Sequence, residues 1–465
     1  MTITDQGPIA AAWTPRPTVA QQLAQGRASR ENLPREALSA APTGARDPMG
    51  ILDAQDVPRV TELVPIRTER MGASAFAFFR GTAAIMAADL ARTPDSGILV
   101  ASCGDAHVAN FGLYASPQRT LAFDLNDFDE AAWAPWEWDV KRLITSVVLA
   151  GQEVGRDERV IRDAALAAVR TYARALRYGA QRTPVERYFD HYDATAAARA
   201  GDRSTKRAIR AAVKDAERRT GERAQRKLTS RTDDGRLVFT EAPPTMTRVD
   251  AAVQARVLDV LQEYRLSTKI DIRMLLRGYA LADLARRVVG VGSVGTRCYL
   301  VAMQDGDGHG LILQAKEAGT SVLVQYGRVP QPPEFDQYVS AHGDGGRVVG
   351  MQRILQAVSD PFLGHVFGTP AEGGPARAFY VRQFHDKKGG FDVDELDDAS
   401  FRWYAEACAA TLARAHGQSP NAAELSGYVG GGRVAGEAIL EWSWMYARQA
   451  KEDWKRFRRH RGVER

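Results

Sequence analysis

Cysteine is scarce in this sequence, and the few that occur are too far apart to act together. Only Cys103, Cys298 and Cys408 are present among 465 residues. Their odd number and wide spacing exclude a disulfide framework and the paired spacing of a zinc site. A reducing compartment is the simplest expectation for such a chain, so we predict a cytoplasmic location.

Long apolar runs and an excess of one charge are also missing. No stretch approaches the roughly 18 apolar residues of a membrane span. The start, MTITDQGPIAAAW, lacks the basic and apolar regions of a signal peptide, so we expect no membrane partner. The 62 basic and 57 acidic side chains leave a net charge of +5, which permits anionic substrates without requiring nucleic acid.

Enough apolar sequence is present for a large core, in segments of different character. The apolar content of 45% is ordinary, and the length suits one large two-lobed enzyme. Residues 1–55, rich in Pro, Ala, Gly and Arg, predict a flexible N-terminal arm. Residues 56–270 predict a helical lobe that contains a strand, GILVA, and a hairpin of FGLYA and TLAFDL. Residues 271–390 predict a small antiparallel β lobe, and residues 391–465 predict helices that return to the helical lobe. The fold class is therefore α+β.

The first group of polar residues is in CGDAHVANFG, directly after the predicted strand. A carboxylate there, Asp105, can accept the proton of an attacking hydroxyl, and the amide of Asn110 can hold a divalent metal. By itself the spacing D-x4-N has little specificity. His107, between them, can form a structural hydrogen bond or contact the metal shell.

The second group, Asp124, Asp127 and Asp129, follows in FDLNDFDE. Carboxylates crowded on one short segment repel each other unless a cation or hydrogen-bond donors compensate. Hard oxygen ligands suit Mg²⁺, so this segment predicts a magnesium site. The alternative is an acidic surface turn, but the apolar flanks in LAFDLNDF argue against full exposure.

The third group begins with GVGSVG, in which Gly290, Gly292, Ser293 and Gly295 fit the spacing G-x-G-x-x-G. A dinucleotide-binding motif requires a helix directly after it, whereas TRCYLVAM here predicts a strand. A glycine-rich turn between two strands instead suits a loop that covers phosphates. Lys316, on the following strand LILQAKEA, can reach nucleotide phosphates or lie at the surface.

Together the three groups resemble the protein-kinase-like superfamily, in particular aminoglycoside and other small-molecule phosphotransferases. GDAHVAN is similar to their catalytic loop GDLHPGN, and NDFDEAAWAPWEWDVKRL is similar to their metal-binding IDFDDA and the helix that follows. The resemblance implies that Asp105 is the catalytic base and that Asn110 and Asp127 bind the metal. Asp124 is a rival for the latter role. The resemblance also implies that Asp139 supports the catalytic loop.

The order of the parts differs from that superfamily, because the glycine-rich loop and the lysine follow the catalytic loop instead of preceding it. The resemblance therefore implies a circularly permuted, two-lobed kinase-like fold, which is feasible when the chain ends lie close together. AEACAATLARAHG, near the C-terminus, is similar to the helix that leads into the catalytic loop in the usual order. We expect this helix to lie close to residue 100.

From about Arg59 onward the chain also resembles a bacterial family of uncharacterised proteins, domain-of-unknown-function family 2252. The stretches that carry this resemblance include LVPIRTERM, FAFFRG, CGDAHVANFG, FDLNDFDE, GVGSVGTR and YVRQFHDKKGG. The family implies the permuted fold but supplies no substrate.

These observations predict a phosphotransferase that depends on ATP and Mg²⁺ and acts on the hydroxyl of an unknown acceptor. A small molecule is preferred over a protein, because no activation-segment signature such as APE follows the aspartates. Two alternatives stay open: transfer of AMP by the same site, and a non-catalytic nucleotide-binding or interaction protein. The basic stretch Lys206–Arg231 is a solvated helix or a phosphate-binding face, and nucleic-acid binding is the weakest interpretation. The sequence is silent on the oligomeric state.

Three charged side chains have partners that the sequence leaves open. Kinases pair the strand lysine with a helix glutamate, and only Glu334 or Asp336 can serve here; otherwise Lys316 lacks that partner. Arg80 and Arg382 can neutralise phosphate or form structural salt bridges.

Overall fold

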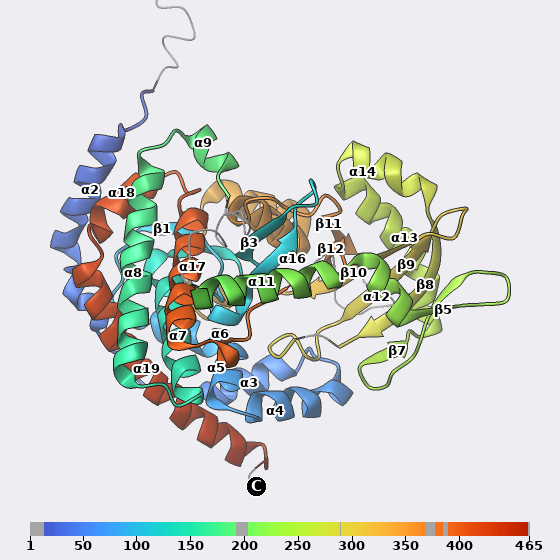
Figure 1. The fold of residues 1–465 in the computed structure, drawn as a ribbon, viewed down its shortest axis with the longest axis horizontal. Helices are drawn as coiled ribbons and strands as arrows, with labels where there is room; N and C mark the ends of the chain where they lie inside the picture. The colour runs from blue at the N-terminus through green and yellow to red at the C-terminus, as the bar shows by residue number, and fades with distance from the viewer. Residues whose placement is uncertain (1–13, 192–202, 289, 369–376, 385–388, 464–465) are drawn as a thin grey trace, which may run out of the picture.

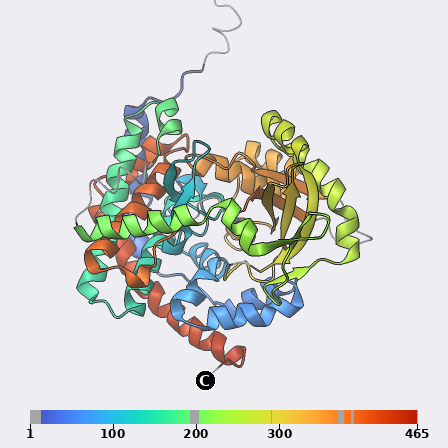
Figure 2. The same cartoon turned by 45° about the vertical axis from the view of Figure 1, so that its right-hand side comes forward.

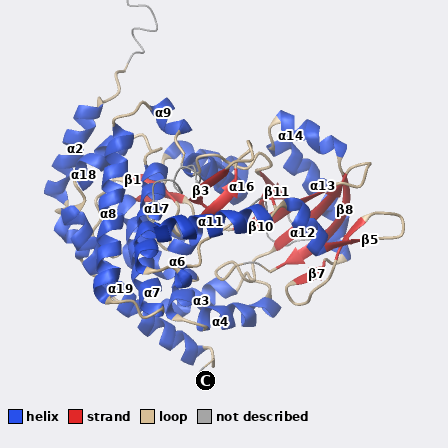
Figure 3. Cartoon of the chain, viewed as in Figure 1, coloured by secondary structure: helices blue, strands red, loops and turns tan. Residues whose placement is uncertain are grey.

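The computed structural model describes residues 14–191, 203–288, 290–368, 377–384 and 389–463. It is an α+β protein in which a helical lobe lies beside a lobe built on an antiparallel sheet (Figures 1 and 2). Figure 3 shows that most strands are in the second lobe, whereas β1 and β3 lie among the helices of the first. None of the described helices is both long and apolar enough to span a bilayer.

Helices from both ends of the chain build the helical lobe. Its core is rich in aromatic pairs, such as Trp136 stacked on Tyr172 with ring centroids 5.8 Å apart. The helices are α2 (Val19–Asn32), α3 (Pro48–Asp56), α4 (Val64–Gly72), α5 (Ala75–Arg80), α6 (Ala83–Leu90), α7 (Trp136–Glu153), α8 (Glu158–Ala180), α9 (Pro184–Phe189), α11 (Arg203–Arg218), α17 (Asp398–His416), α18 (Ala422–Val429) and α19 (Arg433–His460). Short 3-10 helices are η1 (Arg35–Ser39), η2 (Thr61–Leu63), η3 (Val108–Asn110) and η5 (Val393–Glu395).

The N-terminal segment departs from the predicted flexible arm. α2 begins with a capping box, in which Thr18 and Gln21 satisfy each other's backbone N–H groups. The helix packs against α18, and a Cβ atom at Gly26 or Gly427 would collide with the backbone of the facing helix. The two glycines therefore let these helices approach closely. A segment whose composition is typical of disorder is helical here because it packs against another helix. Residues 1–13 lie outside the described residues.

Two short antiparallel strand pairs lie within the helical lobe. The predicted strand GILVA pairs with a strand that directly precedes α7, and the predicted hairpin is confirmed. The first pair is β1 (Leu99–Ser102) with β4 (Ala132–Pro135), and the second is β2 (Phe111–Ala115) with β3 (Leu121–Leu125).

The C-terminal helix expected near residue 100 is α17, and it packs against β1 and β3. The hydroxyl of Tyr404 on this helix donates a hydrogen bond to the carbonyl of Val108 (2.7 Å). The end of the chain therefore completes the surroundings of the loop that carries Asp105.

The second lobe is built on a six-stranded antiparallel sheet with strand order β11-β12-β10-β9-β8-β7. Leu284, Val301, Leu313 and Val381, from the four central strands, share its buried core. The strands are β5 (Thr229–Arg231), β6 (Leu237–Phe239), β7 (Met246–Arg248), β8 (Ala280–Arg287), β9 (Cys298–Gln304), β10 (Gly310–Ala318), β11 (Gly364–Gly368) and β12 (Arg377–Gln383). The helices are α12 (Gly221–Leu228), α13 (Ala251–Ser267), α14 (Ile270–Leu275), η4 (Leu276–Gly278) and α16 (Pro333–Leu355). The short helix α15 (Val322–Gln325) instead packs against α6 and β4 of the helical lobe.

The boundary between the lobes differs from the predicted one at residue 270. β7 pairs with β8, α12 packs against β10 and α13 packs against β11, so residues 221–267 lie with the sheet. α11 instead packs against α17 and runs across the front of the molecule in Figure 1. Helical periodicity identifies these helices but cannot tell which lobe they contact.

Candidate active site

The loop between β1 and η3 is held from behind by a buried carboxylate. Asp139, in the first turn of α7, accepts hydrogen bonds from the backbone N–H groups of Cys103 (2.6 Å) and Gly104 (2.9 Å). Nε2 of His416 on α17 lies 3.2 Å from the same carboxylate, and its Nδ1 lies 2.6 Å from the hydroxyl of Tyr172. The predicted support of this loop by Asp139 is therefore confirmed.

Asp105 lies on this loop, with 20% of its side chain exposed. Its Oδ1 accepts a hydrogen bond from Nε of Arg142 (2.8 Å) and lies 2.7 Å from Nη2 in an ion pair with the same guanidinium. Burial raises the pKa of Asp105 and Arg142 partly offsets this, so the pKa is about 6. The side-chain N–H of Asn110 donates to the Asp105 backbone carbonyl (2.8 Å), which leaves the amide oxygen of Asn110 available. Asp105 is thus ionised at neutral pH and still basic enough to accept a proton.

Lys316 on β10 joins the sheet to the aspartate segment. Its side chain is only 3% exposed; it forms an ion pair with Asp129, and its Nζ lies 3.7 Å from Oδ2 of Asp127. Burial lowers the pKa of Lys316, but these two carboxylates outweigh burial and raise the pKa well above its usual value. The hydroxyl of Tyr380 on β12 also donates to Asp129 (2.8 Å). Residues of β10, β12 and the aspartate segment, which are far apart in the sequence, therefore contact one another at Asp129.

Glu334 and Asp336 do not serve as the partner of Lys316. Both lie in the first turn of α16 and are exposed. Within the described part of the chain, the ion pairs of Lys316 are those with Asp127 and Asp129. Of the two alternatives left open by the sequence, Lys316 thus lacks the helix carboxylate, and its charge is balanced from the aspartate segment instead.

The glycine-rich loop between β8 and β9 presents backbone N–H groups. Gly290 and Gly295 have φ of +70° and +90°, a conformation that favours glycine. The N–H groups of Gly292, Ser293 and Gly295 form no hydrogen bond with a backbone carbonyl of the described residues. Free N–H groups in a turn of this kind can bind an anion.

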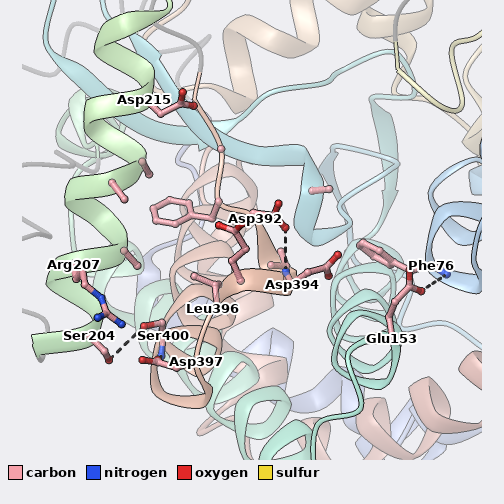
Figure 4. Close-up of a pocket in the computed structure, with 18 of the residues that line it drawn as sticks. Phe76, Glu153, Ser204, Arg207, Asp215, Asp392, Asp394, Leu396, Asp397 and Ser400 are labelled. Carbon is pink, nitrogen blue, oxygen red and sulfur yellow. Dashed lines mark hydrogen bonds between the residues drawn. The ribbon is translucent and has the colours of Figure 1, made fainter.

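Two cavities meet beside the loop that carries Asp105. The first, of about 760 Å³, lies between the lobes and is lined by Gly290, Ser293, Asp127 and Lys316, among others. The second, of about 840 Å³, is lined by α5, α11 and residues 390–397 (Figure 4). Ala109, between Asp105 and Asn110, lines both. Both cavities therefore border the loop that carries Asp105.

The two arginines with open roles lie at different cavities. Arg382 lines the first, where its Nε donates to Gln314 (3.1 Å). Arg80 lines the second, and its Nε has no hydrogen-bond partner in the described residues. Neither arginine forms a salt bridge with a described side chain, so the structural salt-bridge alternative does not hold within that part of the chain.

Comparison of the sequence with known protein families finds a match to a family of bacterial proteins. A family described as an uncharacterized protein conserved in bacteria, domain of unknown function 2252, matches residues 59–460. The chain belongs to this family. No curated protein and no solved structure matches the chain. The matched range includes the Asp105 loop, the aspartate segment, the glycine-rich loop and Lys316, so the candidate site lies wholly within the family region.

In this family member, Asp124 is separated from the other aspartates by its orientation. Its side chain is 2% exposed, and its two oxygens accept backbone N–H groups of Leu125 and Ala357, both at 2.8 Å. Both carboxylate oxygens of Asp124 are therefore occupied by backbone donors, whereas Asp127 lines the cavity between the lobes. Burial raises the pKa of this carboxyl.

The other two predicted metal ligands, Asn110 and Asp127, also carry side-chain oxygen atoms, and Asp127 lines the cavity between the lobes. Both are hard ligands of the kind that Mg²⁺ prefers. In the described residues, no group of three or more His, Cys, Asp or Glu side chains is arranged to hold a metal. The two residues thus fit Mg²⁺ only as a partial set, which phosphate oxygens of a bound molecule would complete.

Sequence reasoning missed Arg142, which is nearly buried. Besides Asp105, it donates to the carbonyl of Phe79 (2.7 Å), and its guanidinium lies 3.9 Å from the centroid of the Phe79 ring. The signal was present, because Arg142 follows Asp139 by one helical turn on the predicted helix. His107 is also buried beside Asp105, with its Nε2 3.7 Å from the carboxylate. Burial lowers the pKa of His107 well below its usual value, which favours a neutral, structural ring.

Proposed function

We propose that this protein is a phosphotransferase that depends on ATP and Mg²⁺ and acts on a small hydroxyl compound. The observation that carries the proposal is the meeting of four parts around one interlobe cavity: the Asp105 loop, Asp127, Lys316 and the glycine-rich loop. Phosphoryl transfer needs little covalent chemistry from the protein, but it does need positioned charges and a base. This set contains both.

Each residue has a defined role in the proposed reaction. The acceptor hydroxyl attacks the γ-phosphorus, an O–P bond forms, the bond to the β–γ bridging oxygen breaks, and ADP leaves. Asp105 takes the hydroxyl proton. Asn110 and Asp127 would hold Mg²⁺, which would supply positive charge to neutralise the phosphates. Lys316 and the N–H groups of the glycine-rich loop then bind the phosphates.

The architecture supports a circularly permuted kinase-like fold as part of this proposal. The sheet that carries Lys316 comes after the Asp105 loop in the sequence, yet Lys316 contacts the aspartate segment that follows this loop. The helix that would precede the loop in the usual order is α17, which contacts β1 and the carbonyl of Val108. A permutation changes chain connectivity but keeps such contacts.

The second cavity is the proposed acceptor site. It reaches Ala109 beside the base and has room for a small molecule. Figure 4 shows side chains from α11 and from the segment around Asp392 and Asp394 on its walls. The acceptor would enter between these two walls and meet the nucleotide at Asp105.

The test combines binding and product analysis. Calorimetry should detect Mg²⁺-dependent ATP binding, and an Asp105→Asn variant should bind ATP as the wild type does while turnover falls by about a hundredfold or more. Mass spectrometry of the products separates a phosphorylated acceptor from an adenylylated one. Absence of nucleotide binding would contradict the proposal, and full activity of Asp105→Asn in cells would favour the non-catalytic alternative.

A further inference from the structure

The glycine-rich loop belongs to the β lobe by sequence, but arginines of the helical lobe hold it. Arg59 donates a hydrogen bond to the carbonyl of Val294, and Arg70 on α4 donates to the carbonyl of Gly290, each at 2.5 Å. A guanidinium–carbonyl bond carries a charge and is stronger than a neutral one. The two ends of the loop are therefore attached to the segment around α4.

Two other contacts attach the loop at the same surface. The backbone N–H of Val60 donates to the carbonyl of Gly295 (2.8 Å). The side chain of Val291 packs into a hydrophobic cluster that belongs entirely to the helical lobe, formed by Leu52, Met71, Phe78, Ile85 and Phe457. Hydrogen bonds and apolar packing therefore both attach the glycine-rich loop to the helical lobe.

The anchoring segment is itself fixed by a carboxylate that several arginines share. Asp56 is 11% exposed and accepts hydrogen bonds from Arg67 (2.8 Å) and from Arg461, just after α19 (2.7 Å). Nε of Arg59 lies 3.6 Å from the same carboxylate. Both ends of the chain therefore set the position of Arg59.

From these contacts we infer that Arg59 and Arg70 are positioning residues of the nucleotide site. They occupy loop carbonyls on the side of the helical lobe, and the N–H groups of Gly292, Ser293 and Gly295 are left for phosphate. The distance between this loop and Asp105 is then set before any nucleotide binds. The inference rests on the proposed function for its ligand, whereas the anchoring of the loop is independent of it.

The test uses the full chain with the double substitution R59M/R70M, which removes both donors and keeps side-chain length. Arg273→Met is the matched control, because Arg273 also donates to a carbonyl, that of Leu266 (2.8 Å), on α13. Hydrogen exchange of residues 290–297 is measured without ligand. Affinities for Mg²⁺-ATP and for adenosine are then measured by calorimetry.

In the double variant we expect faster exchange of the loop, about tenfold weaker ATP binding and unchanged adenosine binding, because only phosphates meet the loop. The control should match the wild type in all three. Equal loss for ATP and adenosine, or no change in either, would overturn the inference. Wild-type protein that binds neither compound would contradict the proposed function itself, and the exchange data would still report whether the arginines anchor the loop.

Discussion

The two loops that meet at the interlobe cavity are held by groups of opposite charge. The loop of Asp105 is braced by a carboxylate, Asp139, which uses up backbone N–H groups. The glycine-rich loop is braced by Arg59 and Arg70, which use up backbone carbonyls. The charge of the side chain that holds a loop thus decides which of its backbone groups are bound. A carboxylate binds N–H groups, and a guanidinium binds carbonyls. In the proposed reaction, the glycine-rich loop uses its N–H donors for phosphate, and the loop of Asp105 does not need them.

The largest effect is expected when the base loses the one arginine that reaches it. In Arg142→Met, Oδ1 of Asp105 loses its Nε donor and its ion pair, and we expect turnover to fall by about a hundredfold with ATP affinity unchanged. Steady-state kinetics and calorimetry measure the two quantities. Arg142→Lys keeps the charge and should lose less; wild-type turnover in Arg142→Met would show that the arginine is only a packing element.

The same substitution changes the pH dependence. Arg142 lowers the pKa of Asp105, which is about 6 in the intact site. Without it that pKa rises, the ionised base is present only at higher pH, and the acidic limb of the rate profile moves upward. A rate profile of Arg142→Met whose acidic limb stays in place would mean that another group is the base.

Removal of the carboxylate brace should act on stability. Asp139→Ala leaves two buried N–H groups without acceptors, and we expect the free energy of unfolding to fall by about 3 kcal/mol. Urea unfolding measures this loss. The exposed Asp163 on α8 provides the control, and Asp163→Ala should change stability by less than about 0.5 kcal/mol. An equal loss of unfolding free energy in the two variants would show that Asp139 does not stabilise the loop.

A smaller effect is expected from the glycine-rich loop. At Gly295, φ is +90° and a Cβ would lie 3.1 Å from Cβ of Arg59. Gly295→Ala should therefore displace the loop and weaken ATP binding by about tenfold. Gly306, in the turn between β9 and β10, has open space around it and an ordinary φ, so Gly306→Ala is the control. Calorimetry compares the two; wild-type affinity in Gly295→Ala would mean that the loop does not meet the nucleotide.

The smallest effect is expected at Asp124. Asp124→Asn should lower stability by about 1 kcal/mol and leave Mg²⁺-dependent ATP binding unchanged. Asp127→Asn should weaken that binding by about tenfold. Titrations of ATP at several Mg²⁺ concentrations distinguish the two. The reverse pattern would assign the metal to Asp124.

Local patterns were sufficient for the parts of the site that lie close together in sequence. Two apolar runs separated by the turn SPQR predicted the hairpin, alternating apolar residues predicted the strand of Lys316, and GDAHVAN marked the loop that Asp139 supports. The contact of α17 with β1 was also anticipated, through a resemblance rather than through periodicity. These features depend on turn chemistry and on a period of two or 3.6 residues, both of which a short window contains.

The orientation of side chains and the contacts between distant segments could not be predicted from the sequence. Asp124 and Asp127 differ by three positions on one segment, yet one is sealed by the N–H of Ala357 and the other faces Lys316. The composition of residues 1–55 predicts a flexible arm and does not reveal α2. The stability of this helix comes from close packing on α18. A window of sequence contains no information about the surface that it will meet.

The amino-acid sequence by itself determined which chemical groups are available: the base, the amide, the crowded aspartates, the glycines and the strand lysine. Only the tertiary structure decided which of them share a cavity, that Lys316 is balanced by Asp127 and Asp129, and that Arg59, Arg70 and Arg142 hold the reacting parts. The reason is physical. Residue type sets charge and hydrogen-bonding capacity, whereas burial and distance, which set pKa and pairing, exist only after the two lobes have packed.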